Sequence, residues 1–176
     1  MARIAIIGGA VCGGLDKELA ERITQRLIQL GHLVVHGGIN SGIMQACFIG
    51  GGTGIVYQSL LEKKITTPGS INTSLLKLQF PGFEEIDFGP AIRRQLLIDA
   101  PDLVIAFEGG IGTYDELVGR LKTKKKLVMI GNFNPHFLAL LTSSEFSGID
   151  VGMILKIKKG RPFELIEAEI VHFLEV

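Results

Sequence analysis

Cysteine is scarce in this chain of 176 residues, and charge of neither sign is in excess. The two cysteines, Cys12 and Cys47, lie far apart, and the chain has no CxxC pair and no histidine cluster. We therefore expect no disulfide framework, no metal site and no cofactor. Lysine plus arginine equals aspartate plus glutamate at 18 each, so no overall charge attracts a polyanion. This balance argues against nucleic acid and an anionic membrane as partners.

Long apolar runs are also missing, since none approaches the roughly 18 residues that a membrane-spanning helix requires. A strand is expected at residues 3–8, directly at the start, rather than a leader segment. These two absences predict a soluble protein, for which the cytoplasm is the default location. The length suits one domain that spans residues 1–176.

Glycine and hydrophobic residues, in contrast, are abundant: the chain has 23 glycines and is 47% hydrophobic. Apolar runs predict strands near residues 3–8, 33–36, 54–57, 84–88, 103–107, 127–131 and 151–157. Helical periods predict helices at 16–31, 41–49, 91–99 and 162–174, and two more that begin at Thr113 and Pro135. The interval Gln58–Phe83 has no clean period, and we expect an irregular segment that covers a crevice or a subunit contact. The alternation predicts an α/β fold with a Rossmann-like, doubly wound, mostly parallel sheet and helices on both faces.

The segment Leu103–Glu116 combines a strand, a glycine turn and the start of a helix. Its apolar run LVIAF is typical of a central strand that is covered on both faces. The glycines let the backbone turn tightly, and we expect Thr113 to begin a helix with Asp115 and Glu116 in its first turn. Free backbone N–H groups at the positive end of a helix dipole suit a phosphate. The expected phosphate-binding residues are Gly109, Gly110, Gly112 and Thr113.

Arg93 lies on the helical segment that precedes this strand. If that helix begins near the carboxyl edge of the sheet, Arg93 and Glu116 face one crevice, at the edge where parallel sheets bind ligands. Each residue also has a simpler interpretation. Glu116 would be an acid that stabilises its own helix dipole, and Arg93 would belong to a surface ion pair, including a pair with Glu116 itself. Their joint placement favours a functional role.

Two motifs resemble the LOG family, cytokinin-activating phosphoribohydrolases that are often described as lysine decarboxylase-like. Arg93-Arg94 followed by Glu108–Glu116 (EGGIGTYDE) is similar to the family's Arg-Lys pair and PGGxGTxxE signature. Upstream, His36–Ala46 (HGGINSGIMQA) resembles the family's glycine loop and helix start. The wider group of Rossmann-like nucleotide-binding proteins, which includes the molybdenum cofactor carriers, is also similar. This resemblance adds three candidate ligand contacts, Gly37, Gly38 and Gly42.

The resemblance implies a nucleotide-binding hydrolase, in which Arg93 and Glu116 are catalytic. Its substrate would be a nucleoside 5′-monophosphate, and cleavage of the N-glycosidic bond would give a free base and ribose 5-phosphate. A carboxylate beneath the sugar would stabilise the positive charge that this cleavage builds on the ribose. The alternative is a non-catalytic protein that binds or carries a nucleotide or a phosphorylated cofactor. In both cases the partner is a small phosphorylated molecule, and the apolar surplus predicts a homo-oligomer, a dimer or larger.

Two positions depart from the family pattern. Glu108 stands in place of the proline before the double glycine, and Arg94 stands in place of the lysine. A carboxylate at position 108 would oppose a bound phosphate if it pointed into the site. We interpret Arg94 as a structural residue.

A nicotinamide dehydrogenase is a weaker alternative. The turn Gly8–Gly14 is one residue away from the dinucleotide fingerprint, because Ala10 replaces the second glycine. The next strand ends in His36, where that fold expects an acid for the ribose. We interpret His36 as a hydrogen-bonded histidine at a strand end rather than as a catalyst.

Overall fold

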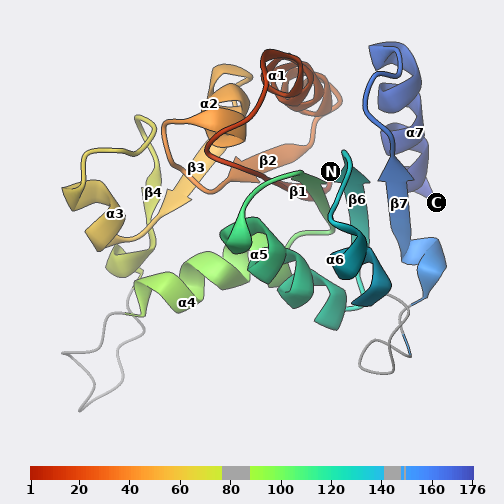
Figure 1. Ribbon diagram of the computed structural model, residues 1–176. Helices are drawn as coiled ribbons and strands as arrows, with labels where there is room; N and C mark the ends of the chain where they lie inside the picture. Colours follow the sequence, from red (N-terminus) through yellow and green to blue (C-terminus); the bar gives the residue numbers. More distant parts are fainter. Residues whose placement is uncertain (77–87, 141–147, 149) are drawn as a thin grey trace.

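The computed structural model describes residues 1–76, 88–140, 148 and 150–176 (Figure 1). Seven strands form one sheet in the order β4-β3-β2-β1-β5-β6-β7, and every neighbouring pair is parallel. The strands are β1 (Arg3–Ile7), β2 (Leu33–His36), β3 (Thr53–Val56), β4 (Ile71–Asn72), β5 (Leu103–Phe107), β6 (Lys126–Ile130) and β7 (Ile154–Ile157). The chain winds outward from β1 to β4 and then returns to β5 on the other side of β1. The predicted doubly wound sheet is confirmed, and its strand order reverses between β1 and β5.

Helices cover both faces of the sheet, as expected (Figure 1). They are α1 (Gly14–Gln29), α2 (Gly42–Ile49), α3 (Gln58–Glu62), α4 (Gly89–Arg94), α5 (Ile111–Lys122), α6 (Pro135–Leu140) and α7 (Phe163–Glu175). A π-helical turn, Gln95–Asp99, continues α4. Buried side chains of α1, α2 and α7 pack on one face, and those of the π-helical turn, α5 and α6 pack on the other.

Strand β5 shows why its sequence is apolar at every position. Successive side chains of a strand point to opposite faces, and both faces are covered here. Leu103, Ile105 and Phe107 therefore join the core beneath α1, α2 and α7, whereas Val104 and Ala106 join the core beneath α5 and α6. All five side chains are buried. This interior strand carries the turn that leads into α5.

The interval Gln58–Phe83 is more regular than expected. Up to residue 76 it contains α3, β4 and a 3₁₀-helix, Thr73–Leu75, so the expectation of an irregular segment is wrong there. Thr67 donates its backbone N–H to the Gly38 carbonyl at 2.7 Å, so the segment does contact the glycine loop that follows β2. Residues 77–87 lie outside the described part of the chain, and with them lies the expected strand at 84–88, except for Phe88.

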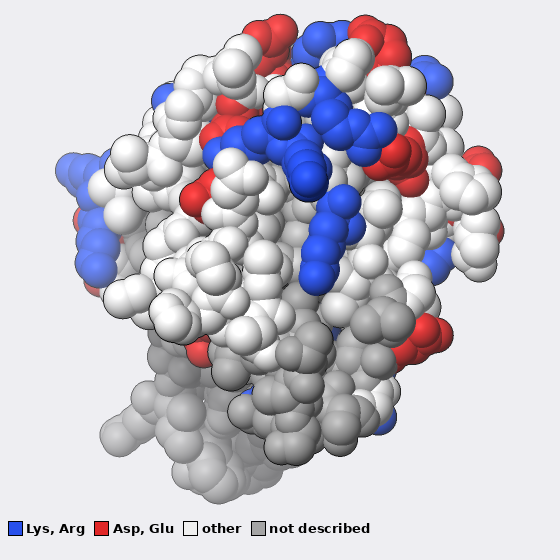
Figure 2. Space-filling view, turned by 45° about the vertical axis from the view of Figure 1, so that its right-hand side comes forward, with Lys and Arg blue, Asp and Glu red and all other residues white. Residues whose placement is uncertain are grey.

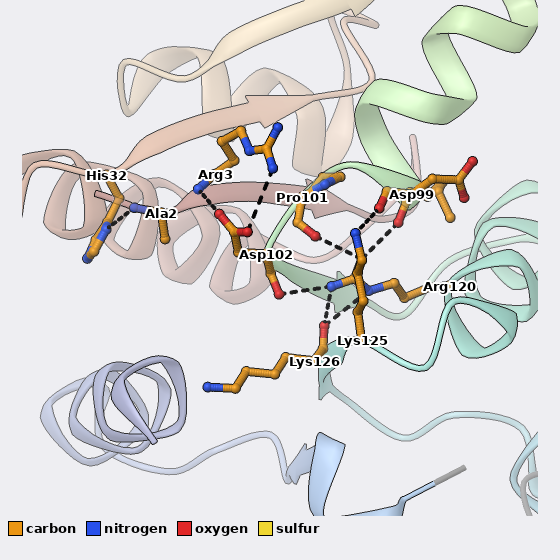
Figure 3. A network of polar contacts seen from close by, with 10 residues as sticks. Ala2, Arg3, His32, Asp99, Pro101, Asp102, Arg120, Lys125 and Lys126 are labelled. Carbon is orange, nitrogen blue, oxygen red and sulfur yellow. Dashed lines mark hydrogen bonds and ion pairs between the residues drawn. The ribbon is translucent and has the colours of Figure 1, made fainter. Parts of the chain in front are cut away.

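Arg120 is the largest fully buried side chain, and it anchors the amino edge of the sheet (Figure 3). Its guanidinium donates hydrogen bonds of 2.7–3.1 Å to four backbone carbonyls, those of Ile98, Pro101, Asp102 and Lys126. Burial lowers the pKa of Arg120 to about 10, so the group remains charged at neutral pH. The starts of β5 and β6 are thereby tied to α5, at the edge opposite the glycine turns.

Balanced charge is also visible on the surface. The face in Figure 2 carries lysine and arginine side chains in its upper half, with acidic side chains close by. Two ion pairs join α1 to α7, Arg22–Glu164 and Arg26–Glu167, and a third joins Arg161, which precedes α7, to Glu169 in that helix. Within the described ranges, no helix is both long and apolar enough to cross a membrane.

Candidate functional site

A pocket of about 250 Å³ opens at the carboxyl ends of β1, β2 and β5. We call it the switch-point pocket because it lies where the strand order reverses. The turns after β1 and β5 form much of its wall, and α4 and α5 each contribute a charged side chain. Its lining residues are Ile7, Gly8, Gly9, Ala10, Gly37, Ile39, Met44, Arg93, Gly110, Gly112, Thr113 and Glu116.

Helix α5 begins at the edge of this pocket, with extended Gly110 as its N-cap. The helix starts at Ile111, two residues earlier than predicted, because the glycine at 112 is accommodated within the first turn. Thr113 and Tyr114 donate their N–H groups to the Gly110 carbonyl at 3.0 and 3.2 Å. Helix geometry gives the N–H groups of residues 111 and 112 no intrahelical acceptor, so they form a donor pair for an anion.

The earlier start changes the position of Glu116. The first turn of α5 contains no acidic residue, so the prediction that Glu116 lies in that turn is wrong. Interaction with the helix dipole falls off beyond the first turn. Helix stabilisation therefore accounts less well for a carboxylate at this position.

Arg93 reaches the pocket from α4 and is held on three sides. Its Nε donates to the Ile55 carbonyl and its Nη2 to the Gly37 carbonyl, both at 3.0 Å. Its Nη1 lies 3.7 Å from Oε1 of Glu116. A Cβ atom on Gly37 would come within 2.7 Å of Nη2, so a larger residue there would displace the guanidinium from its present position.

The Arg93–Glu116 pair is largely withdrawn from solvent, with 18% and 24% of the two side chains exposed. Burial raises the pKa of Glu116, while the Arg93 charge opposes that shift and Asp115 adds to it. The simpler interpretation of Arg93 named an ion pair with Glu116, and that pair exists. It lies in a pocket wall rather than on the open surface.

Residues 1–149 match the model of the SLOG cluster4 family. The chain belongs to the SLOG cluster4 family. The resemblance to LOG-like proteins that the two motifs indicated is confirmed.

Known proteins similar to this SLOG cluster4 protein agree with that placement. A protein of uncharacterised function from Archaeoglobus fulgidus is 25% identical over 132 residues, which cover 74% of this chain and 80% of that one. The molybdenum cofactor binding protein of Rippkaea orientalis has a TM-score of 0.67 at 17% identity, and 99% of this chain and 98% of that one are covered. The molybdenum cofactor carrier protein of Chlamydomonas reinhardtii has a TM-score of 0.64 at 19% identity, with full coverage of both chains. At these identities the two structures show the shared fold.

Six of the nine residues predicted for the site line the switch-point pocket of this SLOG cluster4 protein: Gly37, Arg93, Gly110, Gly112, Thr113 and Glu116. The other three, Gly38, Gly42 and Gly109, support the turns instead. Gly38 and Gly42 have positive φ angles of 75° and 54°. A Cβ atom on Gly109 would meet Thr113 Oγ1 and come within 2.7 Å of the Gly9 nitrogen, so this glycine lets the two turns pack together.

The turn after β1 was missed as part of the site. Gly8, Gly9 and Ala10 line the pocket, together with Ile7, Ile39 and Met44. The glycine run Gly8–Gly14 is the signal in the sequence for this turn, although it does not match the dinucleotide fingerprint. A parallel sheet brings this turn beside the turn after β5 because β1 and β5 are neighbours.

Glu108, at the position of the family proline, does not line the pocket. Its Oε2 lies 3.2 Å from Lys159 Nζ and accepts a hydrogen bond from the Asn132 N–H at 3.3 Å. Lys159 also lies 2.9 Å from Asp16, so one lysine joins the start of α1 to the turn after β5. Arg94 pairs with Asp115 on the exposed side of α5, at 3.2 Å. Neither departure from the motif places a charge in the pocket.

Proposed function

We propose that this protein hydrolyses the N-glycosidic bond of a nucleoside 5′-monophosphate, giving a free base and ribose 5-phosphate. The observation that carries the proposal is the half-buried Arg93–Glu116 pair in a pocket that also contains the start of α5. A carboxylate, a fixed guanidinium and an anion cradle are the groups that this reaction requires.

The phosphate would bind at the start of α5. The N–H groups of residues 111 and 112 and the helix dipole favour an anion there, and Gly110 and Gly112 leave the backbone uncovered. Added Cβ atoms at these two glycines would meet no protein atom within 4 Å. The backbone is therefore open to a ligand rather than to another part of the chain.

The ribose would extend along α5 towards Glu116. Thr113 and Glu116 are three residues apart, and side chains at this spacing lie on the same face of a helix. Both residues line the pocket. A ligand with its phosphate at the helix start would then bring its sugar ring beside the carboxylate.

The reaction would proceed with Glu116 ionised. As the bond between C1′ and the base nitrogen breaks, its electron pair leaves with the base and positive charge builds on the ribose ring. The carboxylate stabilises that charge and orients the water that attacks C1′. The water supplies the hydroxyl of ribose 5-phosphate and the proton that the departing base takes up. Arg93 keeps Glu116 ionised despite its burial and offers Nη1 to the ligand.

The test is release of ribose 5-phosphate from AMP and the other nucleoside monophosphates at neutral pH. Glu116→Gln removes the charge but keeps the shape of the side chain. Asp115→Asn is the matched control, because Asp115 is the neighbouring acid on α5 and pairs with Arg94 on the exposed side. Release by the wild type and by Asp115→Asn but not by Glu116→Gln supports the proposal. Wild-type release no greater than that of Glu116→Gln for every monophosphate refutes it.

A second candidate is a carrier that binds a phosphorylated pterin and releases it unchanged. The similar folds of a molybdenum cofactor binding protein and a molybdenum cofactor carrier favour it. A carrier would be stabilised against heat by its ligand, and the ligand would be recovered intact. Under this alternative Glu116→Gln changes affinity but no chemical step.

Self-association is a further part of the proposal. Val11, Leu15 and Ile111 are more than four-fifths exposed, and they belong to the loop after β1, the start of α1 and the start of α5. Exposed apolar side chains gathered near the same edge are typical of an interface between subunits. Light scattering would give at least twice the chain mass of 19.1 kDa for an oligomer, and a value equal to that mass would exclude it.

A further inference from the structure

His36 is the last residue of β2 and is fully buried. Its Nδ1 accepts a hydrogen bond from the Gly38 N–H at 3.1 Å. A ring nitrogen that accepts a hydrogen bond is unprotonated, so the neutral ring carries its proton on Nε2. Burial lowers the pKa of His36 to about 4, with the Gly52 backbone opposing this shift and the Arg93 charge adding to it. The ring is thus neutral at physiological pH, and Nδ1 remains an acceptor.

This hydrogen bond is one of several that hold the turn Gly37-Gly38 in place. Gly37 and Gly38 have no side chains, and Gly38 has a φ angle of 75°. Glycine loses more conformational freedom on folding than any other residue, so such a turn requires external contacts to hold it. Further contacts hold it as well: the Gly38 carbonyl accepts from the Thr67 N–H at 2.7 Å, and the Gly37 carbonyl accepts from Arg93 at 3.0 Å.

The direction of the Gly37 carbonyl determines where Arg93 points. The guanidinium is planar, and two of its corners are fixed by the Ile55 and Gly37 carbonyls. The remaining corner, Nη1, faces Glu116 at 3.7 Å. A change in the direction of the Gly37 carbonyl would rotate the Arg93 guanidinium and move Nη1 away from the Glu116 carboxylate.

We infer that His36 is a positioning residue for the Arg93–Glu116 pair, acting through the Gly38 N–H and the Gly37 carbonyl. The step from His36 to Arg93 follows from these contacts, whereas the step from Arg93 to catalysis rests on the proposed function. The two steps are therefore measured separately.

Three variants distinguish positioning from simple stability. His36→Leu removes the acceptor, whereas His36→Asn restores one, because the asparagine oxygen occupies a position close to that of Nδ1. Leu27→Ala, in the core beneath α1, supplies a matched loss of stability without touching the turn. Should His36→Leu not fold, His36→Gln replaces it, because its longer side chain carries the amide oxygen past the Nδ1 position.

The first readout needs no substrate. The Arg93 Nε–H donates to the Ile55 carbonyl, so its ¹⁵N-edited NMR signal should exchange slowly with solvent. We expect exchange to be at least about tenfold faster in His36→Leu, and unchanged within about twofold in His36→Asn and Leu27→Ala. Equal exchange in His36→Leu and the wild type overturns the inference.

The second readout is hydrolysis of AMP. Because the pair acts on charge in the transition state, His36→Leu should lower kcat by about tenfold or more while KM changes by less than about threefold. His36→Asn should restore kcat. Absence of hydrolysis of every nucleoside monophosphate, in the wild type as in the variants, refutes the proposed function and leaves the exchange measurement to decide on His36. Hydrolysis with unchanged kcat in His36→Leu overturns the inference while the proposed function stands.

Discussion

Arg93 Nη1 and Glu116 Oε1 lie 3.7 Å apart in the wall of the switch-point pocket, although the two residues belong to different helices, α4 and α5. The contact joins segments on either side of β5 in the chain. It also brings a fixed cation beside a carboxylate whose burial favours the protonated form. The functional account depends on this relationship, and so does the first prediction.

Activity should fall on the acid side at a higher pH than an ordinary glutamate would give. Glu116 must be ionised, and burial raises its pKa above the ordinary value of a glutamate. As the pH falls through that raised pKa, kcat/KM for AMP should decrease by about tenfold per pH unit. Because Asp115 raises the pKa of Glu116, Asp115→Asn should move the acid limb to lower pH. An acid limb that Asp115→Asn moves to higher pH would contradict this assignment.

Two glycines of the same turn should respond in opposite ways to a single methyl group. At Gly112 an added Cβ meets nothing within 4 Å, so Gly112→Ala should leave the free energy of unfolding unchanged or raise it by up to about 1 kcal/mol. At Gly109 the Cβ meets Thr113 Oγ1 and the Gly9 nitrogen, so Gly109→Ala should cost about 2 kcal/mol.

Ligand binding separates the two variants further. Because Gly112 lines the pocket, its alanine variant should bind AMP or inorganic phosphate more weakly despite its full stability. Denaturant unfolding and calorimetric titration measure the two effects. If Gly112→Ala binds phosphate with unchanged affinity, the anion does not bind at the start of α5.

Lys159 should keep Glu108 from opposing an anionic ligand. Lys159→Met leaves the Glu108 and Asp16 carboxylates without their shared cation. Because the Lys159 side chain is partly exposed, its ion pairs should contribute less than about 1 kcal/mol to stability. Affinity for AMP should nevertheless fall by about threefold to tenfold, because Glu108 adjoins the phosphate-binding turn. The double variant Glu108→Gln/Lys159→Met should recover it. Equal affinity in the single and double variants would contradict this role.

Arg120 should be the most costly arginine to replace. Arg120→Met leaves two buried and two partly buried carbonyls without this donor, and each buried loss costs about 1–3 kcal/mol, so we expect a total of at least about 3 kcal/mol. Arg26→Met is the comparison, since its pair with Glu167 is partly exposed and should contribute less than about 1 kcal/mol. Chemical denaturation measures both variants. A similar loss of stability in Arg120→Met and Arg26→Met would show that water can replace Arg120 as the donor to these carbonyls.

The sequence specified most of the sheet because local patterns carry that information. Strand β5 was predicted with its correct bounds, since a wholly apolar run followed by glycines has few other solutions. Strand β4 was missed because it is two residues long and its side chains are exposed or half-buried, so no periodicity marks it. The start of α5 was placed two residues late because Gly110 and Gly112 suggested a longer turn.

The candidate site was predictable only where one of the two motifs contained it. Arg93, Glu116 and the turn after β5 lie in one stretch of sequence, and the pocket includes them. The turn after β1 and the His36 contact with Gly38 arise from neighbouring strands, which local patterns do not report. Arg120 was overlooked because charged residues are expected outside a core, and its partners are carbonyls from three separate segments.

The most direct test of the account is a crystal structure of Glu116→Gln with AMP, because this variant should bind the nucleotide without cleaving it. We predict the phosphate within hydrogen-bond distance of the backbone nitrogens of residues 111 and 112, and the ribose beside the side chains of Arg93 and position 116. A nucleotide bound outside the switch-point pocket, or bound with its phosphate away from α5, would contradict the central claim.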